Sequence, residues 1–512
     1  MDEKDRMTIA ALTSLAEGTI IPFGGDRYTT VPAELAAAFR AGDQLHVVQS
    51  TGALLHVPKA IRSAVATKID AAVDAFARLR TAAPDTVERF YTAFATALAD
   101  DVIWGNIEAA NSQDVVRAEQ LGRSTTRLSV SAQMRRDMIT GLRGWATQQA
   151  TRTDGGSSDL VERVEHDDWS VEIVSAPLGV IGFVFEGRPN VFADAAGVLA
   201  TGNTAVLRIG GDALLTAQAI EQHALRPALL SAGLPEGAIS LIAVRDRAAG
   251  WALFSDTRLA LAVVRGSGAA VTQLGSVARQ SGIPVSAHGT GGAWLVADST
   301  ADTERFARVV RHSLDRKVCN TLNVVAVVRD RAAELVPALL EAADEAAATR
   351  GGDARVHVAR GSEGWVPPDE FKRHIRVRRA EQESDEPRAT PMSLDELGTE
   401  WEWEETPELS LVVVDDIDHA VALFNTYSPQ FVASFISSDS AAHTRFRDLV
   451  NAPFVGDGFT RWVDGQYALV RPELGLSNWE NGRLLGRAGV LTGADLTTRR
   501  TFAHHDSFDQ HR

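Results

Sequence analysis

Cys319 is the only cysteine among the 512 residues, and it stands between an expected helix at 303–314 and an expected strand at 323–328. A single thiol cannot form a disulfide within the chain, so three roles remain: a nucleophile, a ligand or a small buried apolar residue. Many buried cysteines have no chemical role. Residues elsewhere in the sequence must therefore decide whether Cys319 does chemistry.

Asn190 lies just beyond an apolar segment, 179–185, that has the character of a buried strand. The loop between them also contains Arg188. In open α/β sheets, ligands bind beyond the carboxyl ends of parallel strands. The side-chain amide of Asn190 is therefore in a position typical of a binding residue.

Two glycine-containing turns follow other expected strands. The segment 201–211 runs from a turn through a strand to Arg208 and a pair of glycines that open a helix. The segment 264–269 contains Gly266, Ser267 and Gly268 at a helix start, where backbone N–H groups can approach a phosphate. Neither turn fits a dinucleotide fingerprint, a P-loop or a nucleophile elbow. Taken alone, such turns indicate only an α/β protein.

These segments belong to a long alternation of apolar strands and amphipathic helices. Strands are expected at 179–185, 205–209, 259–264, 293–296, 324–328, 409–414 and 431–436. Helices are expected at 213–232, 269–281, 303–314, 332–348 and 418–425. This pattern predicts an α/β fold with more than one parallel-rich sheet, each covered on both faces.

The first half of the chain differs from this alternation. Residues 1–58 form a separate region with two short strands at 44–48 and 54–57, to which we assign no function. Residues 59–149 have apolar positions three and four apart, which indicates long amphipathic helices. Alternating residues from 160 to 174 predict a hairpin.

Composition excludes several classes of partner. The chain has 51 Lys and Arg against 67 Asp and Glu, a net charge of −16, which argues against binding to nucleic acid or anionic lipid. The start of the chain is polar and acidic, and no apolar run reaches the roughly 18 to 20 residues of a membrane span. We expect a cytoplasmic protein without a metal site, and the single cysteine agrees with a reducing compartment.

Taken together and in order, the segments resemble the aldehyde dehydrogenase superfamily, and within it the gamma-glutamyl phosphate reductase (glutamate-5-semialdehyde dehydrogenase) subfamily. The resemblance runs from about residue 59 to the C-terminus and leaves 1–58 outside. It rests on the segments 177–182, 186–190, 202–208, 265–268, 283–285, 288–289, 318–320, 398–401, 425–427, 459–461, 464–465 and 496–498. Their common order makes the resemblance more specific than any one of them.

The resemblance implies an aldehyde dehydrogenase-like arrangement of two α/β domains. Residues 59–300 would bind the cofactor, with part of 440–490 returning to this domain, and residues 301–440 would be catalytic. A hairpin at 158–176 and the segment 491–512 would form an oligomerisation element. A homodimer or a larger homo-oligomer is therefore expected.

The resemblance also implies roles for individual residues. Cys319 would be the nucleophile that forms a thioester, and the Asn190 amide would stabilise the oxyanion together with the Cys319 backbone N–H. The cofactor would be NADP(H), with NAD(H) as the alternative, held by Arg208, Gly266, Ser267, Gly268 and Glu400. Arg188, Arg316, Lys317 and Arg461 would bind an anionic acyl phosphate or carboxylate, with a surface ion pair as the alternative for each.

The chain departs from the resemblance near the substrate. Segment 286–292 has no general-base carboxylate, so phosphate or another nucleophile would open the thioester, or an acyl phosphate would form it in the reverse direction. His288 is a candidate base there, with an ordinary loop histidine as the alternative. Asp315 to Lys317 replaces a Gln-Arg-Pro type of stretch, and residues 470–489 also differ.

Three functions remain open. The first is NADP(H)-dependent reduction of gamma-glutamyl phosphate to glutamate 5-semialdehyde, a step of proline biosynthesis. The second is a related NAD(P)-dependent reductase or dehydrogenase for another activated acyl group or aldehyde. The third is a non-catalytic paralogue that acts as a binding protein, with residues 1–58 as its interaction module.

Overall fold

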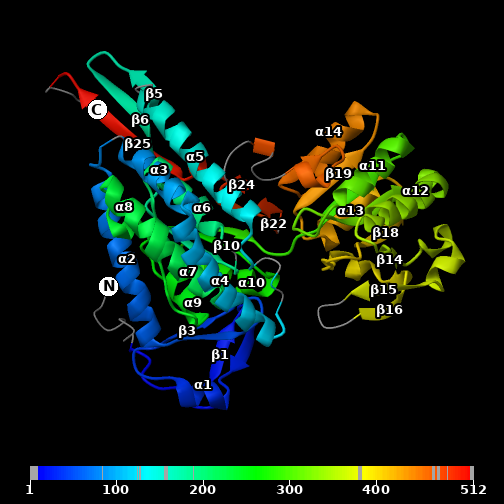
Figure 1. The fold of residues 1–512 in the computed structure, drawn as a ribbon, viewed down its shortest axis with the longest axis horizontal. Coiled ribbons are helices and arrows are strands. Elements are labelled where there is room, and N and C mark those ends of the chain that lie inside the picture. The colour runs from blue at the N-terminus through cyan, green and yellow to red at the C-terminus, as the bar shows by residue number, and fades with distance from the viewer. Residues whose placement is uncertain are drawn as a thin grey trace, which may run out of the picture.

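The computed structural model of the chain has two lobes, each built on a parallel β-sheet (Figure 1). It describes residues 10–83, 85–123, 125, 128–154, 160–187, 189–378, 383–463, 468–469, 473–480 and 482–507. The side chains of residues 150–154 and 494 are not included. The architecture is the α/β arrangement with more than one parallel sheet that the sequence predicts.

The first lobe contains a five-stranded parallel sheet with strand order β11-β10-β7-β8-β9. The strands are β7 (Val180–Phe185), β8 (Thr204–Ile209), β9 (Ile239–Leu241), β10 (Leu259–Arg265) and β11 (Val285–His288). Every residue of the central strand β7 is buried, because helices cover both faces of the sheet. Side chains alternate between the faces, so Phe183 joins one core cluster and Val184 the other.

Helices complete this lobe. One face is covered by α2 (Lys59–Leu79), α9 (Ala248–Phe254) and α10 (Gly268–Gln280). The other face packs against α3 (Thr86–Ala99), α4 (Asp101–Gln120), α5 (Ala132–Asp154) and α6 (Val191–Ala195). A π-helical turn at Glu221–Leu225 joins α7 (Leu214–Ile220) to α8 (Arg226–Ala232) on this face, where one helix was expected.

The second lobe contains a seven-stranded parallel sheet with strand order β17-β14-β18-β13-β12-β19-β20. Its strands are β12 (Ala293–Ala297), β13 (Leu322–Val328), β14 (Arg355–Ala359), β17 (Ala389–Met392), β18 (Glu408–Val414), β19 (Val432–Ile436) and β20 (Phe454–Gly456). One face packs against α11 (Thr303–Ser313) and α12 (Arg329–Ala348), and the other against α13 (Ile417–Tyr427) and α14 (Ser440–Leu449).

The sheets divide the chain between β11 and β12. Because β12 pairs with β13 and β19, residues 293–297 belong to the second sheet, although the expected domain boundary lies at residue 300. The expected strands and helices of the alternation all form. The short strands β9, β11, β14, β17 and β20 were not expected, and β9 and β20, with three residues each, have too few positions to show a period.

Smaller elements extend from the lobes. The N-terminal region has the hairpins β1 (Ile20–Phe23) with β2 (Arg27–Thr30) and β3 (Gln44–Val47) with β4 (Leu54–Val57), separated by α1 (Ala33–Ala38). A three-stranded antiparallel sheet joins β5 (Leu160–Glu165), β6 (Trp169–Pro177) and β25 (Thr497–His505) and projects from the first lobe (Figure 1). The hairpin at 160–174 is thereby confirmed.

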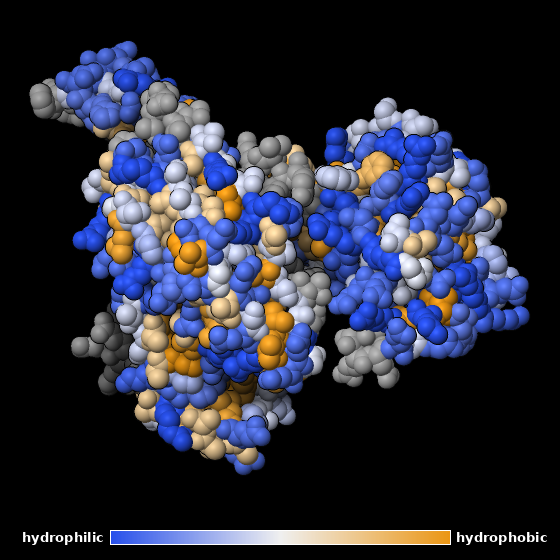
Figure 2. Space-filling model, viewed as in Figure 1, coloured by the Kyte–Doolittle hydropathy of each residue, from blue (hydrophilic) through white to orange (hydrophobic). Residues whose placement is uncertain are grey.

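Further two-stranded ribbons are β15 (His374–Arg378) with β16 (Glu383–Pro387), β21 (Gly475–Leu476) with β24 (Val490–Leu491), and β22 (Trp479–Glu480) with β23 (Arg483–Leu484). Hydrophilic residues predominate on the visible face of the second lobe, whereas apolar patches interrupt the face of the first (Figure 2). None of the described helices is long and apolar enough to cross a membrane.

Candidate active site

Residues of both lobes line a cavity of about 1900 Å³. The carboxyl ends of β7 and β10 line it from the first lobe. The loop that carries Cys319, just before β13, lines it from the second lobe. The predicted residues that line it are Asn190, Arg208, Gly266, Ser267, Arg316, Cys319 and Arg461. Segments distant in sequence therefore meet in one place.

Hydrogen bonds fix the loop that carries Cys319. The Thr321 hydroxyl donates to the Arg316 carbonyl at 2.6 Å and accepts the Val318 N–H at 2.9 Å. The Cys319 carbonyl accepts the Gly292 N–H at 2.7 Å, which ties the loop to the residue before β12. The thiol is half-buried, so a ligand in the cavity can reach it. A reactive cysteine needs both this access and a fixed position.

Glu400 approaches the same loop from the segment after β17. Its Oε2 accepts the Gly291 N–H at 2.6 Å, and its Oε1 lies 2.6 Å from the Lys317 ammonium. A Cβ atom at Gly291 would lie 2.6 Å from the Cys319 carbonyl oxygen and 2.8 Å from Glu400 Oε1. Glu400 is thus held next to the cysteine loop through the backbone of residue 291.

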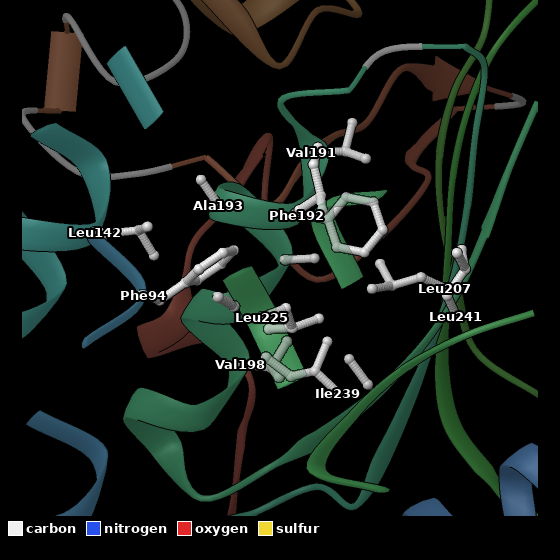
Figure 3. Packing of buried hydrophobic residues seen from close by; sticks show 14 of the residues in the cluster. Phe94, Leu142, Val191, Phe192, Ala193, Val198, Leu207, Leu225, Ile239 and Leu241 are labelled. Carbon is white, nitrogen blue, oxygen red and sulfur yellow. The ribbon is translucent and has the colours of Figure 1, made fainter. Parts of the chain in front are cut away.

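Asn190 is positioned by the hydrophobic core of the first lobe. It immediately precedes α6, and its carbonyl accepts the Ala193 N–H at 3.1 Å. Val191 and Phe192 enter the same core cluster as Phe94 of α3 and Leu142 of α5 (Figure 3). Burial of two large apolar side chains next to Asn190 fixes the backbone from which its amide reaches the cavity.

Arg208 lies at the end of β8 and is mostly buried. Its Nη2 donates to the Arg245 carbonyl at 3.2 Å, while its buried Nε has no acceptor among the described residues. Burial lowers the pKa of the Arg208 guanidinium. Arg247 lines the same part of the cavity and is exposed, without an ion-pair partner in the described part of the chain. A buried donor without an acceptor and a nearby cation form a site that suits an anion.

The turn at the start of α10 holds a carboxylate. The Ser267 N–H donates to the Glu186 carboxylate, and a Cβ atom at Gly266 would lie 3.0 Å from Glu186 Cγ. A Cβ atom at Gly268 would lie 2.9 Å from Thr290 Oγ1. The turn was expected to bind a phosphate through its backbone N–H groups. Here the anion at the helix N-terminus is the Glu186 carboxylate.

The cationic residues near Cys319 differ in their partners. Arg461 donates to the Asn320 side-chain oxygen and, through Nε at 2.6 Å, to Asp315. Lys317 pairs with Glu400, whereas Arg316 is exposed and has no ion-pair partner among the described residues. Arg188, also predicted to bind substrate, lies outside the described residues.

His288 is part of the framework beneath the site. It is buried, its Nδ1 lies 3.0 Å from Asn478 Oδ1, and its ring centroid lies 4.4 Å from that of Phe431. It does not line the cavity. Asn478 also donates to the carbonyls of Thr290 and Pro429, so it joins the two lobes. His288 ends strand β11, and this geometry favours a structural histidine over a catalytic base.

Sequence reasoning did not identify several residues of the cavity. Glu186 had a usable signal, since it directly follows a strand. Lys317, which was expected to bind the substrate anion, lines the cavity but pairs with Glu400 instead. The aromatic residues Phe459 and Trp462, and the ion pair between Arg265 and Glu473, depend on tertiary contacts that the local sequence does not show.

Comparison with known proteins identifies the family. The Aldehyde dehydrogenase family model matches residues 45–359, which includes most of β3 and all of β4, although both were expected to lie outside the resemblance. The chain is 29% identical over 388 residues to the gamma-glutamyl phosphate reductase of Afipia carboxidovorans, covering 72% of this chain and 80% of that protein.

Solved structures show the same fold. The gamma-glutamyl phosphate reductase of Thermotoga maritima has a TM-score of 0.71 at 22% identity, with 88% of this chain and 100% of that chain covered. An acetylating aldehyde dehydrogenase from Geobacillus thermoglucosidasius has a TM-score of 0.60 at 14% identity, with 88% and 99% covered. The expected aldehyde dehydrogenase-like fold is confirmed. The chain belongs to the aldehyde dehydrogenase family and is an oxidoreductase of the aldehyde dehydrogenase type.

Proposed function

We propose that the protein reduces gamma-glutamyl phosphate to glutamate 5-semialdehyde and phosphate with NADPH, through a thioester on Cys319. The observation that carries this proposal is the common cavity of Cys319, Asn190, Arg208 and the exposed Arg316. Similarity to the reductase of Afipia carboxidovorans supports the choice of acyl group. Such a reaction belongs to proline biosynthesis.

The proposed chemistry begins at the Cys319 sulfur. The thiolate attacks the acyl carbon, a C–S bond forms, and the C–O bond to phosphate breaks as phosphate leaves with the electron pair. The Asn190 amide and the Cys319 backbone N–H would donate hydrogen bonds to the carbonyl oxygen as negative charge develops on it. Arg316 would bind the departing phosphate, because it is the exposed arginine next to the nucleophile loop.

The residues present fit a nicotinamide dinucleotide. The cavity is larger than the roughly 300 to 1,000 Å³ of a pocket for one small ligand, so it has room for cofactor and substrate. Arg208 and Arg247 line the cavity and would hold phosphate there, which favours NADPH over NADH. Glu400 is not itself part of the lining, but Lys317 and Glu402 beside it are, and its carboxylate would bind ribose hydroxyls. Bound NADPH would supply the hydride that reduces the thioester.

The surroundings of Cys319 disfavour hydrolysis of the thioester. Residues 286–292, where a general-base glutamate was expected for hydrolysis, contain no carboxylate. A general base must be within hydrogen-bond reach of the water that it activates. The acyl group would therefore be exchanged with phosphate instead of being released as an acid.

One assay tests this proposal. The purified enzyme is given glutamate 5-semialdehyde and NADP⁺ with and without phosphate, beside the Cys319→Ala variant and a panel of short aldehydes. Phosphate-dependent formation of NADPH that the substitution abolishes is the expected result. Activity that does not need phosphate would overturn the acyl-phosphate chemistry. Failure to bind either nucleotide would overturn the cofactor assignment and favour a non-catalytic paralogue.

A second candidate substrate has support from the aromatic residues of the cavity. Phe459 and Trp462 line the cavity with 37% and 59% of their surface exposed. Exposed aromatic surface in a cavity favours an apolar acyl group over the zwitterionic glutamyl chain. In the aldehyde panel, a higher kcat/KM for an apolar aldehyde than for glutamate 5-semialdehyde would select this alternative.

We also propose that the sheet formed by β5, β6 and β25 joins subunits into a homodimer or a larger homo-oligomer. All residues of β5 are exposed, among them Leu160, Val161 and Val164, and Phe502 of β25 is exposed as well. Apolar side chains on a projecting sheet with an open edge are typical of an interface. Light scattering of the wild type and of Val164→Lys should show loss of the oligomer in the variant.

A further inference from the structure

The Lys317 side chain is almost completely buried beside the nucleophile, which is uncommon for a lysine. Only 6% of its side-chain surface is exposed, and its ammonium lies 2.6 Å from Glu400 Oε1. A second carboxylate, Glu402, lies 3.7 Å away, but 66% of that side chain is exposed. Glu400, at 18% exposure, is therefore the principal partner.

The ion pair continues into the backbone of the active site. The other carboxylate oxygen of Glu400 accepts the Gly291 N–H at 2.6 Å, and the next residue, Gly292, donates to the Cys319 carbonyl at 2.7 Å. Lys317 and Cys319 belong to one short loop, so the chain of contacts starts and ends in the same segment. Glu400 is held at two points, and one of them is the Lys317 ammonium.

We propose that Lys317 is a positioning residue that holds Glu400 in the orientation needed for cofactor binding. A carboxylate that loses its cation in a mostly buried place either stays there at an energetic cost or rotates toward water. Either change removes the carboxylate from the geometry that ribose hydroxyls require. This inference rests on the proposed cofactor role of Glu400.

Lys317 and its neighbour Arg316 differ in their ion-pair partners. Arg316 is exposed to the cavity and has no described ion-pair partner, so its charge is available to a ligand. The charge of Lys317 is neutralised by Glu400. Two adjacent cations before the cysteine thus have different tasks: Arg316 faces substrate, and Lys317 acts through Glu400.

The test is a binding measurement in a double-mutant cycle. NADPH is titrated into the full-length wild type, Lys317→Met, Glu400→Gln and the double variant, with cofactor fluorescence as the readout. We expect the Kd of Lys317→Met to rise at least tenfold. In the Glu400→Gln background, the same substitution should change the Kd less than twofold, because Lys317 acts only through Glu400.

Matched variants exclude a general effect of the substitution. Lys317→Arg, which keeps the charge, should restore the Kd to within threefold of the wild type. Glu402→Gln, which removes the exposed carboxylate near the same ammonium, should change it less than twofold. The rate of Cys319 alkylation by iodoacetamide should stay within threefold in all folded variants, whereas a collapsed loop would change it.

Two results would overturn the inference alone. One is a wild-type Kd in Lys317→Met together with a raised Kd in Glu400→Gln, and the other is full additivity in the double variant. If Lys317→Met does not fold, Lys317→Gln replaces it in the cycle with the same expected changes in Kd. Lys317→Arg remains the variant that should restore the Kd. A wild-type protein that binds no NADPH or NADH would overturn the proposed function and this inference together.

Discussion

Gly291 lies against Cys319 so closely that a Cβ atom at position 291 would be 2.7 Å from the Cys319 Cα. The same atom would lie 2.6 Å from the Cys319 carbonyl oxygen and 2.8 Å from Glu400 Oε1. Two of these neighbours are backbone atoms of the nucleophile, and backbone cannot move aside as a flexible side chain can. The position of the thiol therefore depends on the absence of a side chain at residue 291.

Gly291→Ala should reduce kcat at least a hundredfold, because the new methyl group must displace the Cys319 backbone or the Glu400 carboxylate. Steady-state kinetics with the best aldehyde of the panel measure the effect. Gly364→Ala is the matched control, since a Cβ atom there meets nothing within 4 Å. Near-wild-type kcat in Gly291→Ala would show that the loop relaxes easily.

Asn190→Ala should lower kcat by about 10²- to 10³-fold, the usual cost of losing one oxyanion donor. The NADPH Kd and the iodoacetamide alkylation rate of Cys319 should stay within threefold, because α6 keeps its place in the core. A change in kcat smaller than fivefold would remove Asn190 from the oxyanion site.

Arg208→Met should raise the Kd for NADPH at least tenfold and the Kd for NADH less than threefold. The lost guanidinium is proposed to face the 2′-phosphate, which only NADPH carries. Fluorescence titration with both nucleotides gives the ratio. Arg226→Met serves as the control, since it removes an exposed arginine that pairs with Glu236 and does not line the cavity. Equal weakening of both nucleotides would place Arg208 at the shared part of the cofactor.

Because of the Asp114 carboxyl, the free energy of unfolding should decrease as the pH rises. Its side chain is buried, its Oδ2 accepts the Thr216 N–H at 2.8 Å, and burial raises the pKa of the carboxyl above the ordinary value of an aspartate. The folded state thus binds the proton more tightly than the unfolded state. The resulting stability is present below about pH 4 and is lost as the pH passes through the raised pKa.

Asp114→Asn removes this titration while keeping an oxygen for Thr216. Thermal midpoints of wild type and variant, measured from pH 4.5 to 8, should therefore diverge in favour of the variant as the pH increases. A parallel pair of curves would mean that the Asp114 pKa is the same in the folded and unfolded chain.

Much of the fold follows from local sequence pattern. The apolar run of β7 and the periodic segments of α11 and α12 have their own signatures, so their existence and type could be predicted. β11 could not, because Val285–His288 alternates apolar and polar residues over only four positions although most of them are buried. Its strand character comes from pairing with β10, which local pattern does not contain.

The candidate site divides in the same way. Cys319, Asn190 and Arg208 stand next to predicted strand ends, and the sequence indicates them as candidates that the structure brings to one cavity. Their chemical roles stay predictions. The contact between Lys317 and Glu400 joins residues 83 positions apart, so only the tertiary approach of their two segments reveals it.

The pairing of β25 with β6 has a consequence for how the protein forms during synthesis. Thr497 pairs with Pro177 and His505 with Trp169, so the segment 497–505 completes a sheet that begins with the hairpin at 160–177. Contacts of such long sequence separation form late and slowly. One edge of β6 therefore stays unpaired until residues 497–505 have been synthesised.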